Sequence, residues 1–543
     1  MNTINHGLFD NLNKEFLNSE ENNISLLFEK IKYIQGENVI GKSPKIQTKN
    51  FFYEEELVKF SLNEEGLDSL STLKEVAQLF QGVIRPHSPF ALFNMLPSPL
   101  LDTIAASTMT QLYNVNSLMD NFGGKSLIFE QKVARSLGRL IGWPQSVGIS
   151  CNGGKLTLLY AIRMALSRMF PDSNTKGIPT NCVILTNEPS HYCVEHVCML
   201  LGLGSESCIR VAADENWQMC ERALTETIKE QVARGKKIAA VICCGGTTIN
   251  FAHDDTEKIY HIVMQVLDKL NQNYKPHFHL DSVIGWLVFS FKRDSRIHDM
   301  DPIIKGKIQQ IIHRQKGLLF FDSCGVDFHK TGLCPYSTSF FIASSKDMFN
   351  LLNDGSYVYE EEDFLYGNFR AYRYTVENSR PASGIASAYV ALRRLGIDGM
   401  QRYFVALHRM SLDIAKELEK KVAFKVLNKD SLGWEIIFSI RFEKLKRKEQ
   451  FSTLNIEQNF ITFCWNKCEN GDNFPFISFV PGYKASPFSD SQMAFLIYPM
   501  NLNGRECIEE IIDHLEKAVH DFEKSVLEGT LILNVIEKEK TIK

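Results

Sequence analysis

The sequence has 543 residues, of which 44% are hydrophobic and 23% are charged. A chain of this length and composition can bury a large core, exceeds one simple domain and is unlike a disordered protein. Its formal net charge of −4 at pH 7 argues against nucleic-acid binding, and the one basic cluster, at 442–448, predicts a solvated loop or helix face.

Cysteine usage and hydropathy predict the cellular location of the protein. The 13 cysteines follow no disulfide-framework spacing, and several stand in apolar runs such as Val241–Cys244, which is typical of reduced thiols in a cytoplasmic protein. Cys464 and Cys468 have no second pair at zinc-site spacing, so we predict no metal site. The polar N-terminus lacks a signal-peptide core, and no run of about 18 apolar residues predicts a membrane span.

The pattern of elements changes twice along the chain. Residues 1 to about 85 show helical spacing, and the prolines and aromatics of 86–117 predict an extended arm packed on another surface. Between 120 and 345, short apolar strands alternate with amphipathic helices, which predicts βα units and a mostly parallel sheet. We predict three parts: an N-terminal helical segment and arm at 1–119, a large α/β domain at 120–380 and a small α+β domain at 381–543.

Individual elements follow from the same patterns. Strands are predicted at 182–186, 238–243, 278–281, 317–321 and 338–343, and helices at 130–141, 220–234 and 255–270. In the last part, a long helical stretch to about 421 precedes strands at 434–439 and 460–464 and a helix at about 504–528.

A His-Lys pair, His329 and Lys330, stands between the predicted buried strands 317–321 and 338–343. Burying a lysine ammonium is costly unless the group is neutralised, paired or chemically modified. A Schiff base to pyridoxal phosphate is one common solution. A His-Lys pair taken alone is more often a surface feature, so the hypothesis depends on the residues upstream.

Four upstream motifs have both a functional and an ordinary interpretation. Gly153 and Gly154 open an apolar helix, as in a phosphate-binding turn or a plain glycine turn. His191 follows a strand and a turn, where it can stack on an aromatic ring or cap a helix. The Gly-Gly-Thr-Thr segment 245–248 is a possible ligand loop or a strand-to-loop turn. Asp281 ends a strand, where a carboxylate can pair with a pyridinium nitrogen or with solvent.

Taken in this order, the motifs resemble those of the group II pyridoxal phosphate-dependent amino-acid decarboxylases, the family of the glutamate, aromatic amino-acid and tyrosine decarboxylases. The resemblance runs from about Pro86 to Leu418 and more faintly to the C-terminus. It implies an α/β fold of the type I aminotransferase kind, with a mostly parallel central sheet and a smaller C-terminal α+β domain. It also implies pyridoxal 5'-phosphate as cofactor, a small-molecule amino acid as substrate, and a homodimer with the active site at the subunit boundary.

The resemblance also implies roles for single residues. Lys330 forms the imine with the cofactor, with His329 beside it, while Asp281 pairs with the pyridine nitrogen and His191 stacks over the ring. Thr248 lies close to the cofactor. The phosphate is held by Gly153, Gly154 and the amide of Lys155.

The leading prediction is a decarboxylase that removes the α-carboxylate of an amino acid through a Lys330 aldimine and a quinonoid, giving an amine and CO2. Family members commonly use a loop tyrosine to return the proton; the segment 353–368 offers Tyr357, our first candidate, together with Tyr359 and Tyr366. Trp286 and Phe90 favour an aromatic over an acidic substrate.

Three departures from the family pattern keep other reactions open. Val283 replaces a small residue, Lys155 replaces a small or acidic one, and 495–499 lacks an arginine often found there. The alternatives are a carbon–carbon lyase, a decarboxylation-dependent oxidative deaminase, or a catalytically silent dimeric relative.

Overall fold

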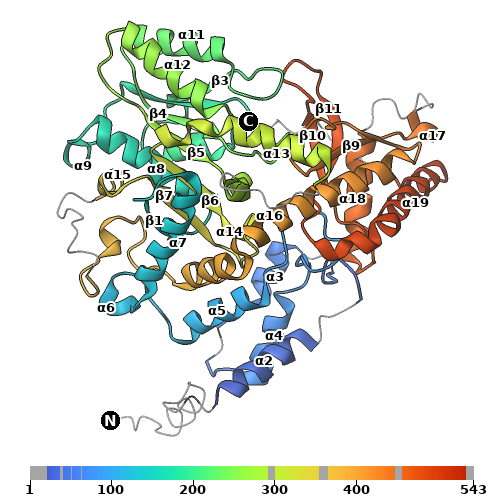
Figure 1. Cartoon of the computed structure of the whole chain (residues 1–543). Helices are drawn as coiled ribbons and strands as arrows, with labels where there is room; N and C mark the ends of the chain where they lie inside the picture. Colours follow the sequence, from blue (N-terminus) through green and yellow to red (C-terminus); the bar gives the residue numbers. More distant parts are fainter. Residues whose placement is uncertain are drawn as a thin grey trace, which may run out of the picture. The chain divides into compact units, whose positions relative to one another are not determined.

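The computed structural model describes residues 21, 23–36, 41–49, 52–62, 64–291, 300–353, 365–446 and 455–533 (Figure 1). Two compact units divide them: the larger comprises Leu92–Glu443 and Ile477–Ile512, and the smaller comprises Met1–Ala91, Lys444–Phe476 and Asp513–Lys543. Each unit therefore joins segments that lie far apart in the sequence. The predicted division at 119/120 and 380/381 stays a prediction.

A seven-stranded sheet forms the centre of the larger unit, in the order β1-β7-β6-β5-β4-β2-β3. Strands β2 to β6 pair in parallel, and β7 is antiparallel to both of its neighbours. Their bounds are β1 (Val147–Cys151), β2 (Cys182–Asn187), β3 (Cys208–Val211), β4 (Lys237–Cys244), β5 (His277–Asp281), β6 (Ser323–Asp327) and β7 (Ser339–Ala343). This topology confirms the predicted α/β fold of the type I aminotransferase kind.

Helices cover both faces of this sheet, so its strands are almost wholly apolar. In β2, Ile184 packs with the apolar side chains of α8 and α10, whereas Val183 and Leu185 join the cluster that contains α11 and α12. This alternation reflects the two-residue period of a strand, and burial on both faces is typical of parallel sheets. The helices of the unit up to β7 are α5 (Leu101–Leu112), α6 (Asp120–Gly123), α7 (Ser126–Ile141), α8 (Gly154–Met169), α9 (Ser173–Lys176), α10 (Cys193–Leu200), α11 (Glu221–Ala233), α12 (Thr256–Lys269), α13 (Pro302–Arg314) and α14 (Phe328–Thr331).

A second, antiparallel sheet of four strands belongs to the same unit, in the order β10-β11-β9-β8. It follows α15 (Lys346–Asn350) and the 37-residue helix α16 (Ser383–Glu419), which is interrupted at Gly396 by a left-handed φ of +59°. The strands are β8 (Phe424–Val426), β9 (Ile436–Ile440), β10 (Ser478–Tyr483) and β11 (Gln492–Ile497). They provide the smaller α+β part that the resemblance implies.

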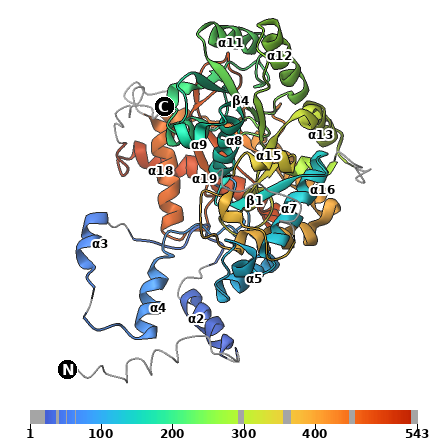
Figure 2. The ribbon, with the colours of Figure 1, turned by 90° about the vertical axis from the view of Figure 1, so that its left-hand side faces the viewer.

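The smaller unit is helical within the described ranges. Its α2 (Ile24–Gly36) and α4 (Ser69–Gln78) lie side by side, and Lys30 Nζ donates to Ser69 Oγ at 2.9 Å (Figure 2). Its other helices are α3 (Tyr53–Lys59) and α18 (Ile456–Glu469). Two more helices, α17 (Glu443–Lys446) and α19 (Ile508–Leu527), have their first residues in the larger unit and the rest in the smaller one.

Three predicted elements are wrong. The run 317–321 is not a strand but mostly a 3₁₀ helix, Lys316–Phe320, which packs on α12: a Cβ at Gly317 would lie 2.3 Å from the amide nitrogen of Glu257. The run 460–464 lies inside α18, and the arm 86–117 contains α5. Short apolar runs suit a buried helix as well as a strand, and tertiary packing decides between them.

The described ranges contain neither a candidate membrane span nor a candidate metal site. No helix there has the length and apolar character needed to cross a bilayer. In those same ranges, no group of three or more His, Cys, Asp or Glu side chains is arranged to hold a metal ion.

Candidate active site

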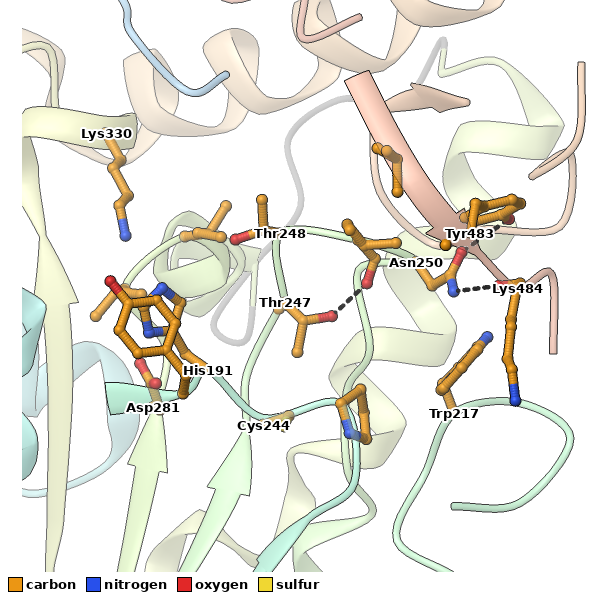
Figure 3. A pocket seen from close by; sticks show the side chains of 18 residues that line it. His191, Trp217, Cys244, Thr247, Thr248, Asn250, Asp281, Lys330, Tyr483 and Lys484 are labelled. Atoms are coloured by element: carbon orange, nitrogen blue, oxygen red, sulfur yellow. Dashed lines mark hydrogen bonds between the residues drawn. The ribbon is translucent and has the colours of Figure 1, made fainter. Parts of the chain in front are cut away.

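A cavity of about 350 Å³ lies at the carboxyl ends of the central strands (Figure 3). This is the edge where open parallel sheets generally bind ligands. Its lining comes from loops that follow the strands, from α14 and from the end of β10: Pro189, His191, Tyr192, Trp217, Cys244, Gly246, Thr247, Thr248, Ile249, Asn250, Asp281, Val283, Ile284, Lys330, Val480, Gly482, Tyr483 and Lys484. The cavity thus brings together four of the predicted site residues: Lys330, Asp281, His191 and Thr248.

Lys330 enters the cavity from α14, which starts directly after β6 (Figure 3). Its Nζ lies 2.9 Å from Asp327 Oδ2, and the lysine side chain is 21% exposed. Burial disfavours the charge of the lysine, but the neighbouring Asp327 carboxylate outweighs it and raises the pKa of Lys330. The lysine is therefore a paired cation at the edge of the cavity.

Asp281 is the last residue of β5, opposite Gly325 of β6. Its Oδ1 is buried and has no hydrogen-bond partner among the described residues. Burial raises the pKa of this carboxyl to about 6, although Lys330 acts in the opposite direction. A buried carboxylate oxygen without a donor is costly, so this position suits a ligand that brings a cationic N–H.

His191 lies at the same end of the cavity as Lys330 and Asp281 (Figure 3). Its Nδ1 accepts a hydrogen bond from the amide of Cys193 at 3.2 Å, and its ring centroid lies 4.4 Å from that of Tyr192. Burial, followed by the charge of Lys330, lowers the pKa of His191 to about 4. At neutral pH the ring is therefore uncharged and presents a flat face.

The Gly-Gly turn lies beside the cavity and does not line it. Gly153 has a φ of +100°, which favours glycine, and precedes α8. A Cβ at Gly154 would lie 2.8 Å from Val283 Cγ1 and 3.1 Å from Asp327 Oδ2, so that position has no room for a side chain. Lys155 also lies outside the lining, and its Nζ is 3.0 Å from His196 Nδ1.

His329 is buried next to the cavity and is not part of its lining. Its Nδ1 lies 3.0 Å from the carbonyl oxygen of Thr338, and its Nε2 lies 3.6 Å from Asp327 Oδ2. The packing of His329 thus helps to fix the segment that carries Lys330.

The loop after β4 holds Thr248 at the cavity through its neighbours. The hydroxyl of Tyr498 donates to the carbonyl of Thr248, and Thr247 Oγ1 donates to the carbonyl of Ile249 at 2.6 Å. Asp254 accepts hydrogen bonds at 2.7 Å from the amides of Cys244 and Met219 and from Asn187 Nδ2. These bonds give Asp254 a structural position, in which it ties the end of β4 to Asn187 and Met219.

Sequence reasoning missed the other end of the cavity, which is formed by Trp217, Asn250, Tyr483 and Lys484 (Figure 3). Two hydrogen bonds connect three of these residues: Tyr483 OH donates to Asn250 Oδ1 at 3.0 Å, and Asn250 Nδ2 donates to the Lys484 carbonyl at 3.1 Å. Trp217 Nε1 donates to the carbonyl of the next residue, Ala485, at 3.1 Å. The residues come from three distant segments, so no local pattern could reveal them.

Other predictions concern residues away from this cavity. Trp286 and Phe90 are fully buried and do not line it, which removes the basis for favouring an aromatic substrate. Tyr357 and Tyr359 lie outside the described residues. Tyr366 is 55% exposed and does not line the cavity.

Comparison with known sequences identifies the family. The model of the pyridoxal-dependent decarboxylase conserved domain matches residues 53–441, more than half of the chain. Glutamate decarboxylase of Drosophila melanogaster is 27% identical over 233 residues, which cover 42% of this chain and 44% of that protein. Human cysteine sulfinic acid decarboxylase is 28% identical over 207 residues, which cover 38% and 42%. The chain thus matches less than half the length of these two curated relatives.

Solved structures show the same fold at lower identity. The crystal structure of mouse CSAD has a TM-score of 0.75 and 18% identity, and the match covers 92% of this chain and 98% of that one. The structure of Oryza sativa TDC with PLP and tryptamine has a TM-score of 0.72 and 12% identity, over 93% and 99% of the two chains.

The residues present fit pyridoxal 5'-phosphate. The unpartnered Oδ1 of Asp281 suits a protonated pyridine nitrogen, and Lys330 offers an amine in the same cavity. Together with the family model, these features show that the chain belongs to the pyridoxal-dependent decarboxylase family and that its cofactor is pyridoxal 5'-phosphate.

Proposed function

We propose that the protein is an amino-acid decarboxylase that releases the α-carboxylate of its substrate as CO2 and gives the corresponding amine. The observation that carries the proposal is the gathering of Lys330, Asp281 and His191 at one end of one cavity, in a chain of this family. Bound pyridoxal phosphate supplies a cationic ring that accepts the electron pair left at the substrate Cα.

Two side chains prepare the ring. The buried carboxylate of Asp281 accepts from the pyridine N–H and keeps that nitrogen protonated, because an opposite charge favours the protonated form. The neutral ring of His191 would stack on the cofactor ring and exclude water from that face. The interaction between the Asp281 carboxylate and the ring nitrogen is stronger where solvent has little access, and Asp281 is buried.

Two further groups hold the cofactor in place. Lys330 would hold it through a covalent bond from its amine nitrogen. The amides of Gly153, Gly154 and Lys155, at the start of α8, bind the phosphate, since a helix N-terminus with exposed N–H groups favours an anion. His329 supports this end of the site.

The proton that replaces CO2 at Cα is assigned to Tyr357. Its segment, 353–368, follows α15 and contains three tyrosines. Replacing Tyr357 by Phe removes the donor hydroxyl and keeps the aromatic ring. A loss of activity in this variant would therefore come from the missing proton donor and not from a missing side chain.

We also propose a homodimer in the cytoplasm, with the active site at the subunit boundary. Three apolar side chains of α5 support an interface: Leu101, Ile104 and Met109 are 82%, 40% and 42% exposed. None of the 13 cysteines, all of which lie within the described ranges, forms a disulfide, and 11 of them are buried, as expected for a reducing compartment.

An acidic amino acid is the substrate that the cavity favours. Lys484 places an ammonium group among the lining residues at the end opposite Lys330, and the two relatives described above are named for glutamate and cysteine sulfinic acid. Release of CO2 from acidic and aromatic amino acids, measured in parallel, tests this choice.

Lys330→Ala is the first test of the proposed function. The variant is expected to lose the visible absorbance of lysine-bound cofactor and all CO2 release, because no other described lysine lining the cavity lies near Asp281. Lys484→Ala, in the same cavity, is the matched control and keeps the absorbance. Full activity of Lys330→Ala would refute the assignment.

A further inference from the structure

Lys330 is bound by a second carboxylate besides the one assigned to the ring nitrogen. Asp327 ends β6 as Asp281 ends β5, and it is 1% exposed. Its Oδ2 lies 2.9 Å from Lys330 Nζ. Its Oδ1 accepts a hydrogen bond from Ser339 Oγ at 2.5 Å, so the carboxylate has one fixed orientation.

The surroundings of Asp327 hold it next to the lysine. Asp327 pairs in register with Ser339 of β7, and its carbonyl accepts a hydrogen bond from Trp286 Nε1 at 3.2 Å. Gly154 leaves room for the carboxylate, whose oxygens lie 3.1 and 3.3 Å from the position of a Cβ there. Three elements, β7, the segment after β5 and the start of α8, therefore define where Asp327 stands.

We propose that Asp327 is a positioning residue that keeps the Lys330 nitrogen positively charged and directed into the cavity, before and after the lysine joins the cofactor. The inference rests on the proposed function, which makes Lys330 the lysine that joins. A buried carboxylate at 2.9 Å is the strongest attraction available to that nitrogen, because Coulomb energy rises as distance and local polarity fall.

The covalent step conserves charge at this nitrogen. The Lys330 amine forms a bond to the aldehyde carbon of the cofactor, and the aldehyde oxygen leaves as water. An ammonium and an aldehyde thereby give a protonated imine and one water, with no net release of a proton. Asp327 can remain the counter-ion throughout, and it leaves Asp281 available for the ring nitrogen.

Other titratable groups also face this pair. The charges of Asp281 in β5 and of Tyr336, between α14 and β7, also raise the pKa of Lys330. The charge of Lys330 in turn lowers the pKa of His191, which precedes α10. The charge of Asp327 also acts to raise the pKa of Cys151 in β1 and that of His329. Among the described residues, Asp327 is the one of these groups that forms an ion pair with Lys330.

The test is the pH at which the holoenzyme loses the absorbance of the protonated, lysine-bound cofactor. A carboxylate beside the nitrogen holds the proton to higher pH, so Asp327→Asn is expected to lower the midpoint by about 1–3 pH units. Asp322→Asn is the matched control: Asp322 directly precedes β6, is buried and pairs with Arg168 and Lys275, and its replacement moves the midpoint by less than about 0.3 units.

Two further measurements keep the outcome decisive. Borohydride reduction followed by peptide mass analysis shows whether Lys330 carries the cofactor, and failure there refutes the proposed function itself. With Lys330 labelled, a midpoint in Asp327→Asn within about 0.3 units of wild type refutes the role of Asp327. Asp327→Glu, which keeps the charge, is expected to restore at least half of the shift, and Asp327→Ser replaces Asn if that variant does not fold.

Discussion

Two aspartates at equivalent strand ends have different environments. Asp281 has a buried oxygen without a hydrogen-bond partner among the described residues, whereas both oxygens of Asp327 lie against Ser339 and Lys330. Asp327 Oδ2 likewise has no hydrogen-bond partner among the described residues, but its ion pair with Lys330 at 2.9 Å gives it a cation, which Asp281 Oδ1 lacks until a donor binds. This difference assigns the two carboxylates to the ring and to the lysine, respectively.

Asp281→Asn tests the first assignment. The amide cannot keep the pyridine nitrogen protonated, so kcat is expected to fall by about 100-fold or more while the cofactor remains bound. Cofactor content from absorbance and the rate of CO2 release measure the two effects separately. Asp322→Asn serves again as control, and a kcat for Asp281→Asn within about threefold of wild type would contradict the role.

Four single residues of the cavity could be predicted from the sequence, whereas the contact between Asp327 and Lys330 could not. Lys330, Asp281, His191 and Thr248 follow strand ends within about 140 residues, so their motifs converge once the sheet is parallel. Asp327 stands in the same motif as Lys330, but its contact with the lysine depends on how the chain turns into α14, which spacing does not show.

A buried ion pair joins three elements next to the Gly-Gly turn. Glu130 of α7 is fully buried and lies 2.8 Å from Arg380 Nη1, while its Oε1 also accepts from the amide of Ser150 in β1. Arg380 in turn donates to the carbonyls of Ser150 and Ser117 at 3.0 and 3.2 Å. The end of β1, and hence the turn that follows it, is fixed by this pair.

Glu130→Gln is expected to lower the free energy of unfolding by about 3–5 kcal/mol, because it leaves the buried charge of Arg380 uncompensated. Urea unfolding at constant slope measures the change as a lower midpoint. The control is Glu226→Gln, which breaks the exposed pair with Arg222 on α11 and should cost no more than about 0.5 kcal/mol. Equal midpoints for Glu130→Gln and wild type would contradict this role.

Elements with a clear period were predictable, and short apolar runs were not. The strands at 182–186, 238–243, 278–281 and 338–343 and the helices at 130–141, 220–234 and 255–270 are all present. The run 460–464 failed because Phe460, Cys464 and Cys468 are buried at four-residue spacing, a helical period that five residues are too few to reveal.

The whole molecule is proposed to act as a dimer with shared active sites. If Tyr357 of one subunit serves the cavity of the other, a mixture of Lys330→Ala and Tyr357→Phe proteins, unfolded and refolded together, will regain activity that neither parent has. Light scattering gives the mass of the same samples against 62.0 kDa for one chain. A dimer that never complements would place the tyrosine in its own subunit, and a monomer would refute the interface.

The grouping of remote segments is the property least accessible from the sequence. Lys444–Phe476 belongs with the N-terminal segment, and Thr48 N donates to the carbonyl of Glu469 at 3.0 Å. Such pairings depend on matching surfaces that neither segment displays in its own pattern.

The hydrogen bonds at the end of β10 connect two sheets through the cofactor loop. Tyr498, which directly follows β11, donates to the carbonyl of Thr248, and Tyr483, the last residue of β10, donates to Asn250 Oδ1; both acceptors belong to the loop that follows β4 of the seven-stranded sheet. Thermal motion that separates β10 and β11 must therefore displace this loop from the bound cofactor. On heating, the visible absorbance of the bound cofactor is therefore expected to fall when the four-stranded sheet unfolds, before the seven-stranded sheet unfolds.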